Sequence, residues 1–399
     1  MRNRTVIVYR ETMLWYSETF IRTQAESLSR FRPLYLCMHR TPGLSLPESR
    51  VRTLCRTGIV GKFQSARFKL LGPSLSQRQR LAGEGPALIH AHFAPNACHV
   101  ISLARALSIP LVVSLHGYDV NQSDDNLPWL YLRRRDLLKA HASRFICVSG
   151  FIRRQALARG FPADKLVVHY TGIDTDFFRE DPDVPRRPII LFVGRLAPSK
   201  GCEYLIRAMV RVREVIPEAK LVVIGDGPLR KELKQQATTL LQNFEFLGVQ
   251  PPAVVRDWMN RATVFSSPCI ATSGDEEGFG MAFTEAQAMG LPVVSCVSGG
   301  IPEAVAHEKT GFLVPERDWE ALSVKLLLLL QNQSLWRRFS EAGRARARGL
   351  FDIKSQATVL ENIYDGVLEE WNSRTDEEPT HNEQQPSSAV EALSSSSRE

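Results

Sequence analysis

The chain is long enough for two or three domains and carries no run of apolar residues that could cross a membrane. It has 399 residues, of which 44% are hydrophobic and 23% charged, and the aliphatic run 326–330 is far shorter than a membrane span. Its seven cysteines occur singly, which excludes a Cys-x-x-Cys zinc site and indicates reduced thiols. The N-terminus leads directly into a strand, so we expect no signal peptide and a cytoplasmic protein.

Positive charge is concentrated in the first half of the chain. Residues 1–180 contain 26 Lys and Arg but 13 Asp and Glu, whereas the whole chain has a net charge of +7. This asymmetry indicates an anionic partner, such as a membrane surface or a lipid phosphate. No nucleic-acid-binding motif accompanies the charge, so we expect no nucleic-acid partner. A basic surface that is merely solvated explains the same charge equally well.

Strand-like and helical runs alternate in residues 1–183, which predicts a parallel sheet covered by helices. We expect strands at 5–10, 33–39, 87–93, 110–116, 145–149 and 165–170, and helices at 20–31, 96–107 and 130–143. Residues 40–86 are less regular, and their segment 62–80 mixes Lys and Arg with apolar residues. The proline-rich stretch 181–188 marks a domain boundary.

The same alternation restarts in residues 188–350 and predicts a second domain. Strands are expected at 189–193, 220–224, 244–248, 263–267 and 291–295, and helices at 202–215, 229–241, 254–261, 281–289, 319–331 and 334–349. An amphipathic helix follows at 353–372. Residues 373–399 are rich in Ser, Glu and Gln without an apolar period, which predicts a disordered tail.

The most informative stretch runs from 274 to 290. Gly278 and Gly280 predict a loop, and a short helix follows from residue 281. The free N–H groups at the start of this helix favour an anion. Glu277 in the loop and Glu285 one turn into the helix can accept hydrogen bonds from hydroxyl groups, which indicates a sugar and a ribose. An ordinary helix cap with a surface glutamate is the alternative.

The sequence Glu277-Gly-Phe-Gly-Met-Ala-Phe-Thr-Glu285 resembles the donor-binding signature of the retaining glycosyltransferases of family 4. The resemblance implies the α/β fold called GT-B, with two Rossmann-like domains facing each other across a cleft and a C-terminal helix returning to the N-terminal domain. It also implies that Glu277 and the amides of Phe279, Gly280 and Met281 bind the sugar of the donor, and that Glu285 binds the ribose.

A second loop of the same half carries two cations. Gly194-Arg195-Leu-Ala-Pro-Ser-Lys200-Gly201 follows the strand at 189–193, where ligands of open parallel sheets are bound. Arg195 and Lys200 suit a diphosphate. The loop resembles the Gly-Arg-Leu-x-x-x-Lys-Gly segment of the same family, which implies that both cations stabilise the leaving diphosphate and that Gly194 contacts the donor.

The next strand ends in Gly225-Asp-Gly-Pro. In the family this turn lies near the nucleotide, so Gly225 is a donor-binding candidate, although a purely structural turn explains it equally well. His116 follows the strand at 110–116. The family has a cleft histidine here that contacts the donor sugar or its phosphate, and a histidine satisfied by the nearby backbone is the alternative.

Ser17 and Glu18 occupy the position where many members of the family have two glycines. This departure resembles the branch that builds bacterial exopolysaccharides and polymers of the colanic-acid type. Both residues are therefore candidates for contacts with the acceptor, although capping of the following helix by Ser17 or Thr19 explains them as well.

Two Asp-x-Asp triplets, 174–176 and 181–183, match the pattern by which metal-dependent glycosyltransferases hold a divalent ion. Both lie at the expected boundary between the domains and far in sequence from Arg195 and Lys200, so capping of loops is the better interpretation. His90 and His92 share one face of a strand but have no third ligand nearby. We expect no metal and no cofactor other than a nucleotide-sugar as co-substrate.

The resemblance implies a hexosyltransferase that moves a sugar from a nucleotide-sugar to a hydroxyl of a saccharide or lipid-linked acceptor with retention, in polysaccharide biosynthesis. No residue stands out as a covalent nucleophile, which suits a front-side attack. If the acceptor is linked to a lipid, we expect the protein to bind peripherally to the inner face of the plasma membrane. The alternatives are a sugar-nucleotide epimerase on the same scaffold and a non-catalytic module that binds nucleotide-sugars.

Overall fold

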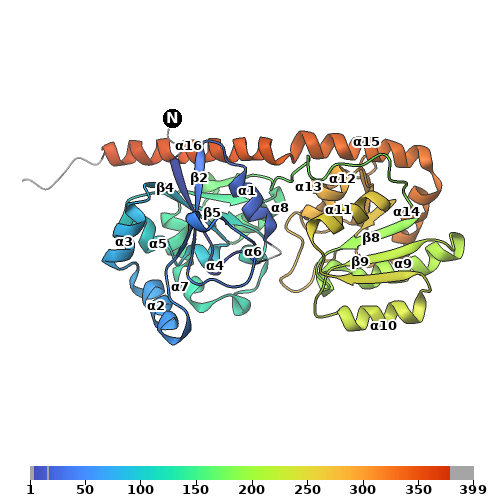
Figure 1. The fold of residues 1–399 in the computed structure, drawn as a ribbon, viewed down its shortest axis with the longest axis horizontal. Helices are drawn as coiled ribbons and strands as arrows, with labels where there is room; N and C mark the ends of the chain where they lie inside the picture. The colour runs from blue at the N-terminus through green and yellow to red at the C-terminus, as the bar shows by residue number, and fades with distance from the viewer. Residues whose placement is uncertain (1–3, 16–17, 378–399) are drawn as a thin grey trace, which may run out of the picture.

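Two parallel β-sheets lie side by side along the long axis of the computed structural model, which describes residues 4–15 and 18–377 (Figure 1). The N-terminal sheet has seven strands in the spatial order β3 (Val51–Thr53), β2 (Phe31–Cys37), β1 (Arg4–Tyr9), β4 (Pro86–His92), β5 (Leu111–Leu115), β6 (Arg144–Cys147) and β7 (Leu166–Val168). The C-terminal sheet has six, in the order β10 (Phe244–Gly248), β9 (Lys220–Ile224), β8 (Ile189–Val193), β11 (Val264–Ser266), β12 (Val293–Cys296) and β13 (Gly311–Val314).

Every pairing between these strands is parallel. Parallel sheets are covered by helices on both faces, so their strands are mostly apolar; Ile190, Leu191 and Phe192 of β8, for example, are completely buried. The predicted α/β fold with two Rossmann-like domains is therefore confirmed.

The helices of the N-terminal domain are α1 (Thr19–Glu26), α2 (Gly58–Leu71), α3 (Leu75–Ala82), α4 (Ala94–Ala97), α5 (Ile101–Leu107), α6 (Tyr118–Asn121), α7 (Trp129–His141) and α8 (Gly150–Ala158). The C-terminal domain contains α9 (Cys202–Val215), α10 (Arg230–Leu240), α11 (Pro252–Arg261), α12 (Met281–Ala288), α13 (Ile301–Ala304), α14 (Trp319–Gln331) and α15 (Gln333–Leu350).

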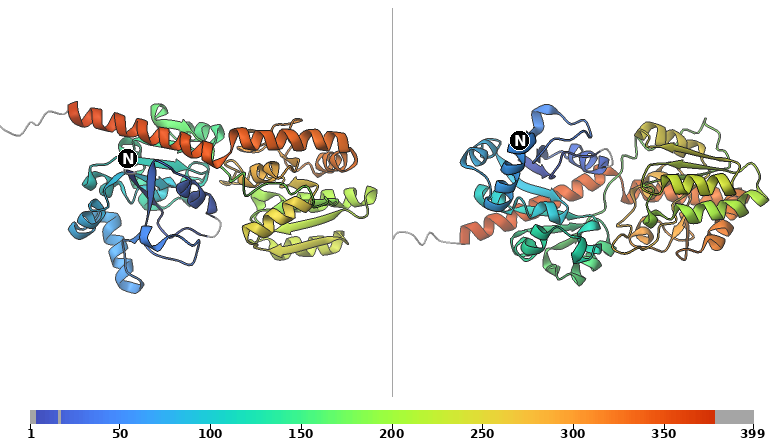
Figure 2. Two further views of the ribbon diagram at one scale, coloured as in Figure 1. Left: turned by 45° about the horizontal axis from the view of Figure 1, so that its top comes forward. Right: turned by 90° about the horizontal axis from the view of Figure 1, so that it is seen from below.

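The last helix, α16 (Ile353–Glu377), leaves the C-terminal domain and lies along the N-terminal one (Figures 1 and 2). The carboxylate of Glu361 accepts hydrogen bonds from the amides of Ser29 and Arg30 at 2.7 and 2.5 Å, and Tyr364 packs edge-on against Phe31 with ring centroids 5.1 Å apart. The predicted return of the C-terminal helix is thus confirmed.

The chain passes between the domains twice, and the two passages are bonded to each other. The amide of Ile173 donates to the carbonyl of Phe351, and the amide of Ile353 donates to the carbonyl of Ile173, both at 2.8 Å. A Cβ on Gly172 would lie 2.7 Å from the Cα of Ile353, so the close contact requires glycine here. The two connections therefore form one short parallel pair.

Three expectations about local structure need correction. The helix expected at 96–107 is two helices, α4 and α5, because the amides of His99 and Val100 bond to carbonyls three residues back and tighten the turn between them. The region 40–86 contains β3, α2 and α3. Helix α16 continues to Glu377, past the expected end at 372, and the rest of the expected tail, 378–399, lies outside the described residues.

All seven cysteines are buried and free. Among the described helices, none is long and apolar enough to span a membrane.

Candidate active site

The loops that carry the two sequence motifs meet at the point where the strand order of the C-terminal sheet reverses. From β8 the chain runs outward through β9 and β10, and it then returns to the other side of β8 to form β11. The loops that follow β8 and β11 therefore diverge and leave a crevice at the carboxyl ends of the strands, where α/β proteins bind their ligands. The first of these loops contains Arg195 and Lys200, and the second contains Glu277.

Lys200 and Glu277, which are 77 residues apart, form an ion pair between the two loops. Their side chains are 26% and 17% exposed. Burial alone would lower the pKa of Lys200, but the carboxylate of Glu277 outweighs it and holds this pKa above its ordinary value. Ser199 adds a second link between the loops, because its hydroxyl donates to Asp275 at 2.6 Å. The crevice thus contains an ammonium group that stays charged at neutral pH.

Arg195 is exposed, and no described residue forms a hydrogen bond or an ion pair with its guanidinium. Its five N–H donors are therefore available to an anion in solution. Gly194 and Gly225, which follow the neighbouring strands β8 and β9, approach so closely that a Cβ on Gly225 would lie 1.9 Å from the carbonyl oxygen of Gly194. The contact gives Gly225 a structural reason to be glycine, and its donor-binding role stays a prediction.

Helix α12 begins immediately after the Glu277 loop. Gly280 has φ +86°, and a Cβ there would lie 2.3 Å from the ring of Phe283, so only glycine fits. In the described part of the chain, no acceptor faces the amides of Phe279, Gly280 and Met281. The ring of Phe279 is buried and stacks on Tyr170 with centroids 5.3 Å apart. Phe279 can therefore offer a ligand its amide but not its ring.

Glu285 lies one turn into α12 and is partly buried. No described residue donates a hydrogen bond or a charge to its carboxylate. Burial raises the pKa of Glu285 from its ordinary value of 4.5 to about 7. A carboxylate in this position without a partner is suited to receive hydrogen bonds from a ligand.

The opposite side of the site is formed by rings from the N-terminal domain. His116 directly follows β5, and its ring centroid lies 4.5 Å from that of Phe93 and 5.1 Å from that of Phe20. Its Nε2 lies 3.1 Å from Nδ1 of His92, so these two atoms share one proton in a hydrogen bond. Burial lowers the pKa of His116 to about 3, so the imidazole is neutral and can offer a ligand a hydrogen bond but no positive charge.

His90 has no free ring nitrogen, since Nδ1 bonds to the hydroxyl of Tyr364 at 2.6 Å and Nε2 to that of Ser114 at 2.8 Å. These bonds give His90 a structural role. Asp119 fixes the neighbouring strand ends, because its carboxylate accepts the amides of His116, at 2.7 Å, and Ala94. Burial raises the pKa of Asp119 to about 6. The sequence analysis gave Asp119 no role.

Arg10 is a further residue that the sequence analysis missed. It directly follows β1, and its Nε and Nη2 donate to Oε1 of Glu18 at 2.9 and 2.6 Å. The other oxygen of Glu18 accepts the amide of Trp15 at 3.1 Å. The guanidinium of Arg10 lies 4.3 Å from the centroid of the Phe93 ring.

Glu18 is thus buried and engaged at both oxygens, and its observed partners belong to the protein. Helix α1 begins at Thr19 and is preceded by Glu18, which makes no side-chain capping bond. Ser17, the other acceptor-side candidate, lies outside the described residues. An acceptor contact by either residue stays a prediction.

Several hydrogen bonds join the two domains beside the site. Both carboxylate oxygens of Glu303, on α13, accept amides at the start of α8, from Gly150 and Phe151, at 2.7 Å each. The hydroxyl of Ser149 donates to the carbonyl of Gly278 at 2.6 Å, and the side-chain amide of Asn121 donates to the carbonyl of Glu276 at 3.3 Å. The loop that carries Glu277 is therefore held from both domains.

Two families cover most of the chain. Residues 17–177 match Glycosyltransferase Family 4, and residues 174–346 match Glycosyl transferases group 1. The two matches meet at the first connection between the domains, so each domain of the fold corresponds to one match.

Two bacterial glycosyltransferases also align with most of the chain. The GDP-mannose-dependent alpha-(1-6)-phosphatidylinositol monomannoside mannosyltransferase of Mycolicibacterium smegmatis is 30% identical over 66% of this chain and 72% of its own. The amylovoran biosynthesis glycosyltransferase AmsK of Erwinia amylovora is 28% identical over 76% of this chain and 77% of its own.

Among solved structures, Anabaena Alr3699/HepE in complex with UDP and glucose superimposes with a TM-score of 0.74 at 21% identity, over 91% of this chain and all of that one. This similarity concerns the fold. The matches over both domains and the identity to the mannosyltransferase confirm the resemblance noted in the sequence: the chain belongs to the glycosyltransferases of family 4.

Proposed function

We propose that this glycosyltransferase moves a hexose from a nucleoside diphosphate sugar to a hydroxyl of a saccharide or lipid-linked acceptor, with retention, in polysaccharide or glycolipid biosynthesis. One observation carries the proposal. The ion pair between Lys200 and Glu277 joins the loop that also carries the unpaired guanidinium of Arg195 to the loop that ends in the free amides at the start of α12. Such a set of donors stabilises a diphosphate, and a diphosphate is the leaving group of a nucleotide-sugar.

In this proposal the cations act on the leaving group. Arg195 and Lys200 stabilise the negative charge that develops on the diphosphate as its bond to the anomeric carbon breaks. Glu277 and the amides of residues 279–281 orient the hexose, and Glu285 accepts hydrogen bonds from the ribose. His116, being neutral, contributes a hydrogen bond to the sugar or its phosphate.

Retention follows from a front-side attack. The acceptor hydroxyl approaches the anomeric carbon from the face that the diphosphate leaves, and its proton passes to an oxygen of the departing diphosphate. Glu277 is tied to Lys200 and is therefore poorly placed to act as a nucleophile. The new glycosidic bond thus replaces the old one without a covalent enzyme intermediate.

Activity is expected to survive EDTA. Asp174 caps a turn by accepting the amides of Asp176 and Phe177 at 3.1 and 2.9 Å, and Asp181 accepts the amide of Asp183 at 3.1 Å. These carboxylates stabilise the connection between the domains, and we propose that they hold no ion on the donor. Initial rates with and without EDTA test this, and a complete loss that manganese or magnesium restores would contradict it.

The donor is best identified by a thermal-shift screen of UDP-, GDP- and ADP-sugars, because a ligand that binds only the folded state raises the melting temperature. The named relatives favour this choice: one is described as GDP-mannose-dependent, and the structure of Anabaena Alr3699/HepE contains UDP and glucose. The stabilising donor is then incubated with and without acceptors. Release of nucleoside diphosphate that depends on an acceptor supports transfer, whereas conversion of the sugar without an acceptor would indicate an epimerase.

We further propose that the enzyme works as a peripheral protein on the cytoplasmic face of an anionic membrane. The excess of Lys and Arg in residues 1–180 supports this, since each cation near an anionic surface contributes about 1 kcal/mol of attraction.

A further inference from the structure

Helix α2 buries the ring of Phe68 but turns most of its other large apolar side chains toward the solvent. Ile59, Phe63 and Leu71 are 74%, 73% and 78% exposed, while the buried positions of the helix include Gly61 and Ser65. A helix on the surface of a soluble domain normally buries its apolar stripe. An exposed apolar face of this kind marks a surface that contacts something else.

Cations lie on the same helix and on the side of the molecule to which it belongs. Lys62 and Arg67 are exposed on α2, and Arg134 of α7 donates to the carbonyls of Lys69 and Leu70 at the end of the helix. Helix α2 lies at the edge of the N-terminal domain that is opposite to α16 (Figures 1 and 2). Apolar and cationic side chains together at an exposed edge are typical of a helix that lies in the interface of an anionic bilayer.

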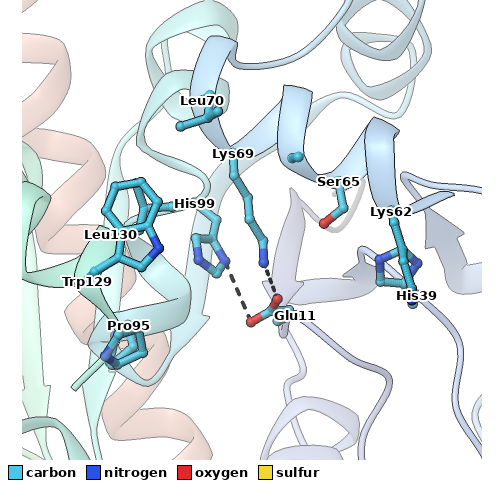
Figure 3. A pocket seen from close by; sticks show the side chains of 12 residues that line it. Glu11, His39, Lys62, Ser65, Lys69, Leu70, Pro95, His99, Trp129 and Leu130 are labelled. Carbon is cyan, nitrogen blue, oxygen red and sulfur yellow. Dashed lines mark hydrogen bonds and ion pairs between the residues drawn. The ribbon is translucent and has the colours of Figure 1, made fainter. Parts of the chain in front are cut away.

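A cavity of about 540 Å³ opens beside this helix. Its polar lining includes Lys62, Lys69, His99 and a single carboxylate, that of Glu11 (Figure 3). Its apolar lining includes Leu70 and Trp129, which are 53% and 62% exposed. Charged and apolar side chains both line the cavity, so it is amphiphilic.

The charge inside the cavity is not balanced within the protein. Lys69 bonds to Glu11 and neutralises it, which leaves the ammonium of Lys62 without an ion-pair partner among the described residues. His99 is 7% exposed, and its Nδ1 is buried without a hydrogen-bond partner, 3.9 Å from the nearer oxygen of Glu11. A buried polar atom without a hydrogen-bond partner is costly, and a ligand that bonds to it would remove this cost.

The wall of the cavity is connected to the candidate site through Arg10 and Phe93. Glu11 directly follows Arg10, whose guanidinium lies over the ring of Phe93. Phe93 in turn contacts the ring of His116. Arg10, Phe93 and His116 therefore form a continuous set of contacts from the wall of the cavity to the candidate site.

We propose that this cavity binds the phosphate-bearing head of a membrane lipid to which the acceptor is attached, while the exposed face of α2 lies in the surface of the bilayer. Lys62 and the free nitrogen of His99 would meet the phosphate, and Leu70 and Trp129 would meet the first methylene groups of the lipid. The inference rests on the proposed function for the identity of the acceptor, and it narrows that acceptor to an anionic amphiphile.

The first test is vesicle flotation of the full chain. The protein should float with vesicles of phosphatidylglycerol and phosphatidylcholine at low salt and not with phosphatidylcholine alone. The triple variant Ile59→Ser/Phe63→Ser/Leu71→Ser should reduce the floating fraction at least fivefold. The matched control Val215→Ser/Leu240→Ser/Val249→Ser removes three exposed apolar side chains from the C-terminal domain and should float like the wild type.

The second test separates the cavity from the helix and needs no donor. Binding is measured by calorimetry with n-dodecyl phosphate below its micellar concentration, with inorganic phosphate as the head alone and n-dodecyl maltoside as an uncharged amphiphile. Dodecyl phosphate should bind at least tenfold more tightly than either. Lys62→Gln should weaken it about tenfold, whereas Lys231→Gln, an exposed lysine of the other domain, should not.

Several results would overturn the proposal. They are equal affinity for dodecyl phosphate and phosphate, flotation of the α2 variant at the wild-type level, or a dimer in solution that the α2 variant dissociates, since a second copy would then cover the face. Failure of the proposed function is recognised separately, as absence of acceptor-dependent nucleoside diphosphate release in a protein that still binds dodecyl phosphate.

Discussion

Removing either cation of the crevice is expected to lower turnover by two orders of magnitude or more. Arg195→Ala and Lys200→Ala each remove a charge that acts on the diphosphate as it leaves. A contact made to developing charge is worth about 3 kcal/mol in the transition state, which is roughly a hundredfold in rate. Initial rates of nucleoside diphosphate release at saturating donor measure the effect.

The two variants also differ in a useful way. Arg195 has no partner in the described structure, so Arg195→Ala should leave the melting temperature unchanged. Lys200→Ala leaves the partly buried carboxylate of Glu277 unpaired and should destabilise the fold as well. The matched control is Lys220→Ala. This lysine forms an ion pair with Glu245 at 2.7 Å, at a position away from the crevice. Wild-type turnover in both crevice variants would refute the assignment.

The second large effect concerns the stability of the unliganded protein and its dependence on pH. Burial raises the pKa of Glu285 to about 7 in the folded state, above its ordinary 4.5. Between these two values the folded chain holds a proton that the unfolded chain has lost, so stability falls as the pH rises from about 4.5 to 7. A shift of this size corresponds to about 3 kcal/mol.

Glu285→Gln removes this titration. Above pH 7.5 the variant should be more stable than the wild type by up to about 3 kcal/mol, and at pH 4.5 the difference should be small. Urea unfolding from pH 4.5 to 8 measures both curves, with Glu308→Gln as a control at an exposed carboxylate. Parallel curves for the wild type and Glu285→Gln would show that Glu285 does not carry the shift.

The same group links stability to the donor. If ribose hydroxyls donate to the Glu285 carboxylate, they favour its charged form and lower its pKa, so donor binding near pH 7 should release protons. Calorimetry in buffers of different ionisation enthalpy would detect this release, and Glu285→Gln should abolish it.

The two motifs could be located from the sequence because each is a local pattern at the end of a strand. Aliphatic runs fixed β8 and β9 at the residues that the structure shows, and the glycines after them predicted turns. Parallel strands bring their carboxyl ends to one edge, so both loops could be expected at the same edge of the sheet. The contact between Lys200 and Glu277 depends in addition on β8 and β11 being neighbours, which the sequence does not show.

The remaining contacts depend on the packing of distant segments. Nothing in the sequence near Glu303 indicates that its carboxylate meets the first amides of α8, 152 and 153 residues earlier. Glu18 was expected to face an acceptor because it lies in the first loop after a strand. The sequence did not show that Arg10 folds back to occupy its carboxylate. Helix α2 was not expected, because it buries a single large apolar side chain, Phe68, beside Gly61 and Ser65 and exposes several others, so its sequence lacks the usual amphipathic pattern.

The bonded pair of connections at Ile173 and Phe351 also determines how the two domains can move. A single flexible link would permit rotation in any direction, whereas two parallel links joined by hydrogen bonds resist twisting and leave bending about one axis. Points near that axis hardly move, and the stacked rings of Tyr170 and Phe279 lie beside it. Helices α2 and α10 lie on the side of the two domains opposite to α15 and α16, so bending about this axis moves them the most (Figure 1). A membrane that holds α2 would therefore keep one domain still while the other swings, so opening of the crevice would displace the donor and leave the acceptor in place.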